Sequence, residues 1–234
     1  MPTRQASSVS ARLLPAALLV AGALAYSSWV LDIGLVSGVD PLRGYVSELG
    51  ARDRPLGALY RTADLIAALL VASAGAVVLK RPLHGRWQLF GWVALMVFAV
   101  ATLLDSRWPM ACAPSVHPGC DAGSAGSSMS ETLHAIFSSV ASTAALFAAA
   151  CCWLAIRRID APQWRRLLSG GSVVVLVTAT AWTLAAIALR EQHVLYLGLA
   201  QRAQLIGTSA WLIVAALDAL WSARPATSAA VGVK

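Results

Sequence analysis

The sequence predicts an all-α fold, a polytopic membrane protein built as a bundle of six transmembrane helices with the N- and C-termini cytoplasmic. Six separate apolar stretches occupy most of the 234 residues. A bilayer core of about 30 Å requires roughly 20 apolar residues in a helix, in which every backbone polar group is satisfied internally. Hydrophobic residues make up 58% of the chain and charged residues only 12%, against roughly 25% charged residues in a soluble domain. No room remains for a soluble domain.

The apolar stretches define a single membrane domain, residues 13–222, between short cytoplasmic tails at residues 1–12 and 223–234. The predicted helices are residues 13–36, 56–80, 87–104, 131–156, 167–189 and 199–221. The first of them contains Ala23-Leu24-Ala25, the small-x-small form of a signal-peptidase site. Its apolar run continues to Val36, which is too long for the core of a signal peptide, so we expect a retained helix.

Breaker residues separate the later helices. Pro82 and Gly85 lie in the link between the second and third helices, and Pro162 lies between the fourth and fifth. Links this short make neighbouring helices antiparallel. The two long connections, residues 37–55 and 105–130, therefore fall together at the opposite end of the bundle.

Lysine and arginine concentrate in the tails and the short links, which the positive-inside rule places in the cytoplasm. The net charge of +7 is thus a topology signal, with some affinity for anionic headgroups, and nucleic acid is not a predicted partner. The basic residues on this side are Arg4, Arg12, Lys80, Arg81, Arg86, Arg157, Arg158, Arg165, Arg166, Arg224 and Lys234.

The four cysteines form two pairs of different character. Cys112 and Cys120 lie in the second long connection, which this topology places in an oxidising compartment, so we expect a disulfide between them. A thiolate metal or redox site there would require a reducing environment or more ligands. Cys151 and Cys152 lie within the fourth helix and are expected to pack as small apolar residues.

Ionisable residues gather in the predicted outer half of the bundle. Charges within membrane spans are costly and usually turn inward, so we expect an outward-facing polar site. Its candidate catalytic residues are His134, Asp105, Glu131 and Ser47, and its candidate substrate-binding residues are Glu48, Arg61, Asp64 and Arg202.

The fourth helix carries the clearest polar stripe. Glu131, His134, Ser138 and Ser142 are spaced by three, four and four residues and share one helical face. Glu131 has a structural alternative, because Ser128-x-x-Glu131 matches a capping box. For His134 the alternative is a hydrogen-bonded interhelical histidine, and for the two serines it is packing.

Two arginines also have alternative roles. Arg61 and Asp64 are three residues apart on the second helix, where they can pair with each other or face a substrate. Arg202, at the start of the sixth helix, can pair with Glu191 or Asp105, or bind an anionic headgroup as a planar fork.

These residues could serve three kinds of chemistry: a metal site, a serine hydrolase or ion-coupled transport. A metal site is disfavoured because Glu131-x-x-His134 is the only motif of its kind, and no cofactor is expected. A serine hydrolase would require Ser47, His134 and Asp105 to converge, which happens only if the first long connection folds inward. Ion- or proton-coupled transport would use the carboxylates together with His134, whose side chain suits proton exchange.

The chain resembles a membrane family of bacteria and archaea called domain of unknown function 998. The resemblance rests on Ser47-Glu48-Leu49-Gly50, on Asp105 with Pro109, and on Gly198-Leu199-x-Gln201-Arg202. The resemblance leads us to expect Glu at the position of Gln201 in many relatives, so the Gln in this chain argues against an acid role there. The resemblance implies six helices and a multi-pass address in the bacterial cytoplasmic membrane, and it assigns no reaction.

We therefore expect an integral membrane protein whose outward-facing site binds or acts on a lipid or other amphiphile. One alternative is a small-solute or proton-coupled transporter. Another is a non-catalytic accessory subunit with a membrane-protein partner, whose outer charges pair only among themselves.

Overall fold

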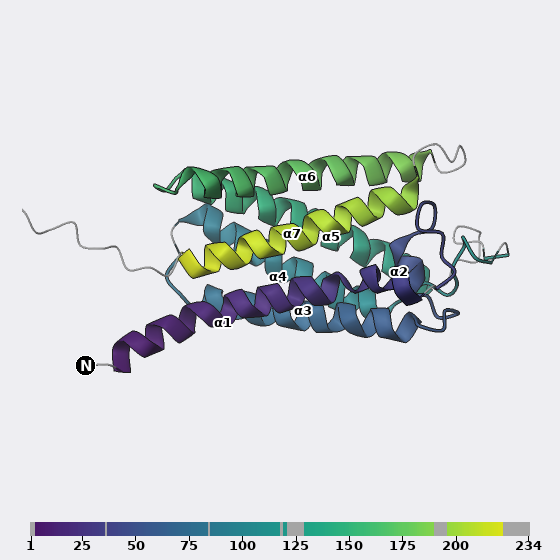
Figure 1. Ribbon diagram of the computed structural model, residues 1–234, viewed down its shortest axis with the longest axis horizontal. Helices are drawn as coiled ribbons and strands as arrows, with labels where there is room; N and C mark the ends of the chain where they lie inside the picture. The colour runs from purple at the N-terminus through teal and green to yellow at the C-terminus, as the bar shows by residue number, and fades with distance from the viewer. Residues whose placement is uncertain are drawn as a thin grey trace, which may run out of the picture.

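The computed structural model describes residues 3–35, 37–83, 85–117, 119–120, 129–189 and 196–221. Within them the chain forms seven α-helices and no strand, so the all-α prediction is confirmed for this part of the chain. The α-helices are α1 (Thr3–Tyr26), α2 (Asp32–Leu35), α3 (Gly57–Leu79), α4 (Arg86–Arg107), α5 (Met129–Arg157), α6 (Gln163–Ala188) and α7 (Leu197–Trp221). Two short 3₁₀-helices, η1 (Ser28–Leu31) and η2 (Val46–Gly50), precede α3. The long helices run side by side along the longest axis of the molecule (Figure 1).

Five helices, α3 to α7, are long and apolar enough to cross a membrane. A sixth span is present if Arg12–Tyr26 and Ser28–Leu35 count as one, although the two segments are bent by 41°. The bend lies at Ser27, whose hydroxyl hydrogen-bonds the carbonyl of Ala23 and the hydroxyl of Ser209, each at 2.9 Å. Serine hydroxyls compete with the backbone for hydrogen bonds, and helices often kink at such residues. The first predicted helix is therefore not continuous.

Helix boundaries differ from the prediction where a helix begins in polar sequence. α6 starts at Gln163, directly after Pro162, rather than at residue 167. The residues that hydropathy missed are polar but favour helix. α1 starts at Thr3, within the region predicted as a tail, whereas the tail 223–234 lies outside the described residues.

The long helices form a closed ring in which each packs against two neighbours. The order around the ring is α1, α3, α4, α5, α6 and α7, with α7 returning to α1. Alanines such as Ala74 and Ala148 are fully buried between helices, while Phe98 and Leu212 fill the centre. Small residues at these contacts let the backbones approach closely, as is typical of membrane helices.

The two ends of the ring differ. We call the end formed by residues 37–56 and 108–120 the loop end, and the end where α4 begins and α5 finishes the basic end. At the loop end the two long connections are joined by a hydrogen bond from the Arg52 N–H to the Met110 carbonyl at 3.0 Å. The predicted pairing of Cys112 with Cys120 is confirmed, with a Cα–Cα distance of 6.0 Å. Cys151 and Cys152 are free thiols.

Candidate functional site

A polar cavity of about 120 Å³ lies inside the ring near the loop end. A water molecule needs only about 10–15 Å³ of such volume, so the cavity has room for several waters or one small group. Five of the eight predicted site residues line it: Ser47, Arg61, Asp64, Asp105 and His134. The rest of its wall is made by Tyr26, Ser28, Trp29, Val46, Leu49, Gly50, Tyr60, Thr102, Ser106, Pro109, Ser138, Ala141, Ser142, Gln201, Gln204 and Leu205.

Asp105 on α4 meets the polar stripe of α5. The Nδ1 atom of His134 lies 2.9 Å from Oδ1 of Asp105, which is an ion-pair distance, although the ring N–H is not aligned for a hydrogen bond. The hydroxyl of Ser138 donates to the same carboxylate oxygen at 3.0 Å. His134 and Ser138 are four residues apart, so the helical spacing brings both side chains to one carboxylate.

Arg61 and Asp64 line the same cavity but do not pair. The Nη1 atom of Arg61 donates to the carbonyls of Gly50 at 2.6 Å and Ala51 at 3.4 Å. These carbonyls lie at the end of η2, where backbone acceptors lack helical partners. Asp64 makes no hydrogen bond or ion pair with any described residue, so the structural pairing considered for Arg61 and Asp64 is not formed.

Three aromatic side chains, those of Tyr26, Trp29 and Tyr60, form an aromatic wall of the cavity. Tyr26 lies on Phe98 in an edge-to-face contact, with ring centres 5.5 Å apart. Tyr60 is 4% exposed, and its hydroxyl has no hydrogen-bond partner among the described residues. The indole N–H of Trp29 is also buried without a partner there. Buried donors are nearly always satisfied, so these two indicate a water or ligand group at the cavity.

Glu48, a candidate substrate-binding residue, lies in the roof of the cavity, the part of the two long connections that covers it at the loop end. It is 1% exposed and does not line the cavity, whereas its neighbour Ser47 does. The Glu48 carboxylate accepts hydrogen bonds from the Tyr45 N–H at 2.8 Å and from the N–H of Ser115 at 3.0 Å, and it also bonds the Ser115 hydroxyl. It thereby ties η2 to the connection that carries the disulfide.

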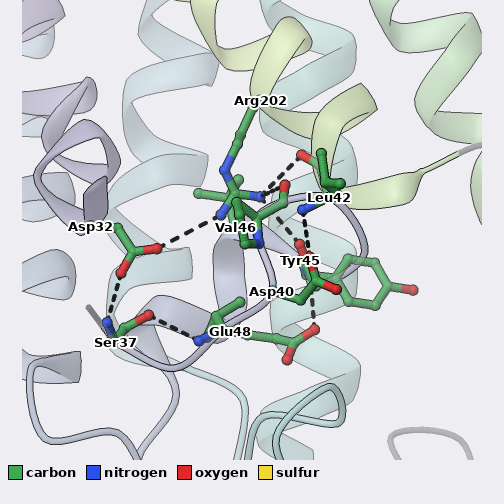
Figure 2. A network of polar contacts seen from close by, with 12 residues as sticks. Asp32, Ser37, Asp40, Leu42, Tyr45, Val46, Glu48 and Arg202 are labelled. Atoms are coloured by element: carbon green, nitrogen blue, oxygen red, sulfur yellow. Dashed lines mark hydrogen bonds and ion pairs between the residues drawn. The ribbon is translucent and has the colours of Figure 1, made fainter. Parts of the chain in front are cut away.

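Arg202 anchors the same roof from α7 (Figure 2). Its Nη1 donates to the carbonyls of Pro41 at 2.7 Å and Gly198 at 3.2 Å, and its Nη2 lies 3.9 Å from Oδ2 of Asp32. The Arg202 side chain is thus paired with Asp32 rather than with Asp105, and the other predicted partner, Glu191, lies outside the described residues.

The other residues of the Gly198-Leu199-x-Gln201-Arg202 motif have related roles. The side-chain carbonyl of Gln201 accepts the Val46 N–H at 2.5 Å. A Cβ at Gly198 would lie 2.5 Å from the carbonyl oxygen of Gly44, so only glycine fits there. The motif therefore fastens the first long connection to α7.

The chemical capacity of the cavity follows from these contacts. Ser47 and His134 share the cavity, but the Ser47 hydroxyl has no hydrogen bond within the described part of the chain, so the nucleophile–base contact of a serine hydrolase is not formed. Within that same part, no group of three His, Cys, Asp or Glu side chains is placed to hold a metal. Glu131 lies in the first turn of α5 and does not line the cavity, and its predicted capping partner Ser128 is outside the described residues.

Sequence reasoning missed Tyr26, Ser28 and Trp29 as cavity residues. They lie where the first predicted helix breaks, and the sequence analysis treated residues 13–36 as one continuous helix. The adjacent serines Ser27 and Ser28 were the available signal of the break.

Comparison with known proteins identifies a family for this chain. A family model described as "Protein of unknown function (DUF998)" matches residues 19–218, a range that contains every residue lining the cavity. No curated protein and no solved structure matches the chain.

Proposed function

The chain belongs to the family of proteins of unknown function DUF998, and we propose that its cavity binds a small organic ammonium group, carried by a membrane amphiphile. The observation that carries this proposal is the Asp64 carboxylate, which lines the cavity and makes no hydrogen bond or ion pair with a described residue. An ionised carboxylate within a membrane bundle is costly unless a cation compensates it. An ammonium group would supply that cation.

The aromatic wall supports a cation of this kind. Trp29, Tyr26 and Tyr60 border the same cavity as Asp64. Aromatic faces attract organic cations within about 6 Å, and cages of such side chains recognise ammonium groups.

The size of the cavity supports a headgroup rather than a whole ligand. Pockets that enclose drug-sized molecules measure about 300–1,000 Å³, and this one measures about 120 Å³. Asp64 lies seven residues after Gly57, about 10 Å along α3 from its start at the loop end. An amphiphile could place its amine there and leave its apolar part in the bilayer. The charge pattern supports the outer leaflet as the place of this headgroup, and we propose the bacterial cytoplasmic membrane as the location.

The proposal is tested with purified protein in nanodiscs of uncharged lipid, using hexadecylamine as the amphiphile and tetramethylammonium as the soluble cation. Asp64→Asn should weaken hexadecylamine binding at least tenfold, because a hydrogen bond or ion pair to a charged group is worth about 1.5–3 kcal/mol. Asp160→Asn, which removes an exposed carboxylate at the basic end, is the control and should change nothing.

Equal hexadecylamine binding by wild type and Asp64→Asn would refute the proposal. If tetramethylammonium binds as tightly as hexadecylamine, the ligand is a soluble amine and the amphiphile part of the proposal is wrong. The lipid composition of cells that express His134→Ala or Asp105→Ala then tests whether binding is followed by a reaction. An altered composition relative to wild type would support a reaction, and an unchanged composition would count against it.

Proton- or ion-coupled transport is the second candidate, because a smaller cavity of about 20 Å³ lies on the other side of the core. It is lined by Gln88, Cys152 and Asp218 among others, and it shares no lining residue with the first cavity. Transport would therefore require the apolar core between them to open. It predicts a pH-dependent flux in proteoliposomes that Asp64→Asn abolishes, and flux no greater than that of empty liposomes would exclude it.

A non-catalytic accessory role would require the loop-end charges to pair only among themselves. Asp64 does not meet this requirement, because Arg61 donates to the Gly50 carbonyl at the end of η2 and does not pair with Asp64. An accessory role predicts that a membrane-protein partner co-purifies with this chain. It also predicts that a variant with Arg61 and Asp64 exchanged still folds and binds that partner. Loss of amine binding in the exchanged variant would instead favour the ammonium site.

A further inference from the structure

The basic end carries a second cluster of functional groups, centred on Trp87 in the first turn of α4. The guanidinium carbon of Arg86 lies 5.4 Å from the centre of the Trp87 ring, and that of Arg158, at the end of α5, also lies 5.4 Å from it. The two guanidinium carbons are therefore at most about 11 Å apart. We call Arg86, Trp87 and Arg158 the Trp87 cluster.

The donors of the Trp87 cluster lack acceptors. Arg86 and Arg158 are exposed, and neither guanidinium group makes a hydrogen bond or ion pair within the described part of the chain. The indole N–H of Trp87 is buried and has no hydrogen-bond partner there. Two positive charges held on one ring repel each other, so an anion that contacts both would stabilise the arrangement.

The start of α4 adds backbone donors to the same place. α4 begins at Arg86 after Gly85, whose φ of 90° suits glycine. No side chain caps this helix and its first turn contains no acid. The first N–H groups of a helix lack intrahelical acceptors and favour anions. Three kinds of donor thus meet at one end of α4 without a carboxylate in that turn.

We propose that the Trp87 cluster binds the phosphate group of an anionic lipid headgroup. The planar guanidinium fork matches phosphate oxygens, and two forks near one indole provide several donors for one anion. The cluster lies at the ends of two membrane-spanning helices, α4 and α5, where tryptophan and arginine meet the headgroup layer. This position favours a lipid over a soluble phosphate compound.

Positive charge is in excess at this end of the bundle. Burial, and then the nearby Arg12, lower the pKa of the Arg81 guanidinium, which shows that like charges approach one another here. Juxtamembrane basic residues of this kind are attracted to anionic lipids in the cytoplasmic leaflet. The site is independent of the ammonium cavity, which lies at the loop end.

The experiment compares lipids retained by the protein in native mass spectrometry, using micelles that contain phosphatidylglycerol and phosphatidylcholine. Wild type should retain phosphatidylglycerol preferentially. Arg86→Gln with Arg158→Gln should lower the retained phosphatidylglycerol about tenfold, and Trp87→Phe, which removes the N–H donor and keeps a smaller aromatic ring, should lower it severalfold. Arg166→Gln is the matched control, because Arg166 is an exposed arginine of the same end whose Nη2 donates to the Ile159 carbonyl at 3.1 Å.

An equal loss in Arg166→Gln and in the double variant would overturn the proposal, because the effect would then be general surface charge. Equal retention of both lipids by wild type would also overturn it. A third arm adds inorganic phosphate and glycerol phosphate without lipid. Thermal stabilisation by these compounds that matches stabilisation by phosphatidylglycerol would overturn the lipid assignment.

Discussion

Asp105 of α4 and His134 of α5 face each other across the tightest helix pair at the cavity, with His134 Nδ1 2.9 Å from Asp105 Oδ1. Ser138 donates to the same oxygen at 3.0 Å, so one carboxylate joins two successive turns of α5 to α4. Nε2 is the ring nitrogen that Asp105 does not engage.

The shared oxygen predicts non-additive mutations. Ser138→Ala should lower the free energy of unfolding by about 0.6 kcal/mol, the average for a hydrogen bond between membrane helices. Asp105→Asn should cost more, because it removes the charge that both α5 residues face. The double variant should cost less than the sum of the two, as expected for residues in one network. Strictly additive values in detergent unfolding experiments would contradict the shared contact.

Gly198 at the roof of the cavity should tolerate alanine poorly. In Gly198→Ala the new Cβ would lie 2.5 Å from the Gly44 carbonyl and 2.8 Å from that of Pro41, and both are backbone atoms. We expect a loss of more than about 2 kcal/mol, as for overpacking in a tight core. Gly171→Ala is the control: no atom lies within 4 Å of its Cβ, and alanine should stabilise α6 by about 0.5–1 kcal/mol. Equal melting temperatures of the two variants would disprove the close contact.

Glu48 should contribute to stability rather than to ligand binding. Glu48→Gln keeps the size of the side chain but loses charge-assisted bonds to the Tyr45 and Ser115 N–H groups. The expected cost is about 1.5–3 kcal/mol in the free energy of unfolding. Asp40→Asn, at an exposed turn, is the control. If Glu48→Gln abolished amine binding while the melting temperature stayed unchanged, Glu48 would be a ligand-binding residue and this prediction would be wrong.

The disulfide should stabilise the loop end measurably. Cys112 and Cys120 are separated by eight residues, and closing a loop of that size stabilises a protein by about 2.5 kcal/mol in the chain-entropy account. Cys112→Ser should lower the melting temperature, and a reductant should lower that of wild type by the same amount. A reductant should have no effect on the Cys112→Ser variant. Insensitivity of wild type to reductant would show that the bond does not contribute.

Orientation is tested by cysteine labelling in intact cells. The charge pattern predicts that Arg43→Cys, at the loop end, reacts with an impermeant maleimide from outside, and that Arg166→Cys reacts only after permeabilisation. Both positions are exposed. The reverse pattern would move the loop end and its cavity to the cytoplasm.

Helix-scale features could be predicted because they depend on local sequence. Apolar length and breakers such as Pro162 locate the spans, and the spacing of His134 and Ser138 correctly places them on one face. The bend at Ser27 was missed because hydropathy averages over a polar pair within an apolar run.

The roles of Glu48, Arg61 and Arg202 could not be predicted in the same way. Each of these side chains binds backbone groups of one of the two long connections. Arg202, for example, donates to the Pro41 carbonyl, and Glu48 accepts the Ser115 N–H. A residue's charge and helical face show that it needs a partner. They do not show which backbone atom the folded connection will bring to it.

The ring order has a consequence for how the chain can be rearranged. Because α7 packs against α1, the first and last helices in the sequence are neighbours in space. A circular permutant that links residue 221 to residue 12 and opens the chain between Arg157 and Gln163 would keep every helix–helix interface of the ring. The protein should also assemble from two separately expressed fragments divided at the same point.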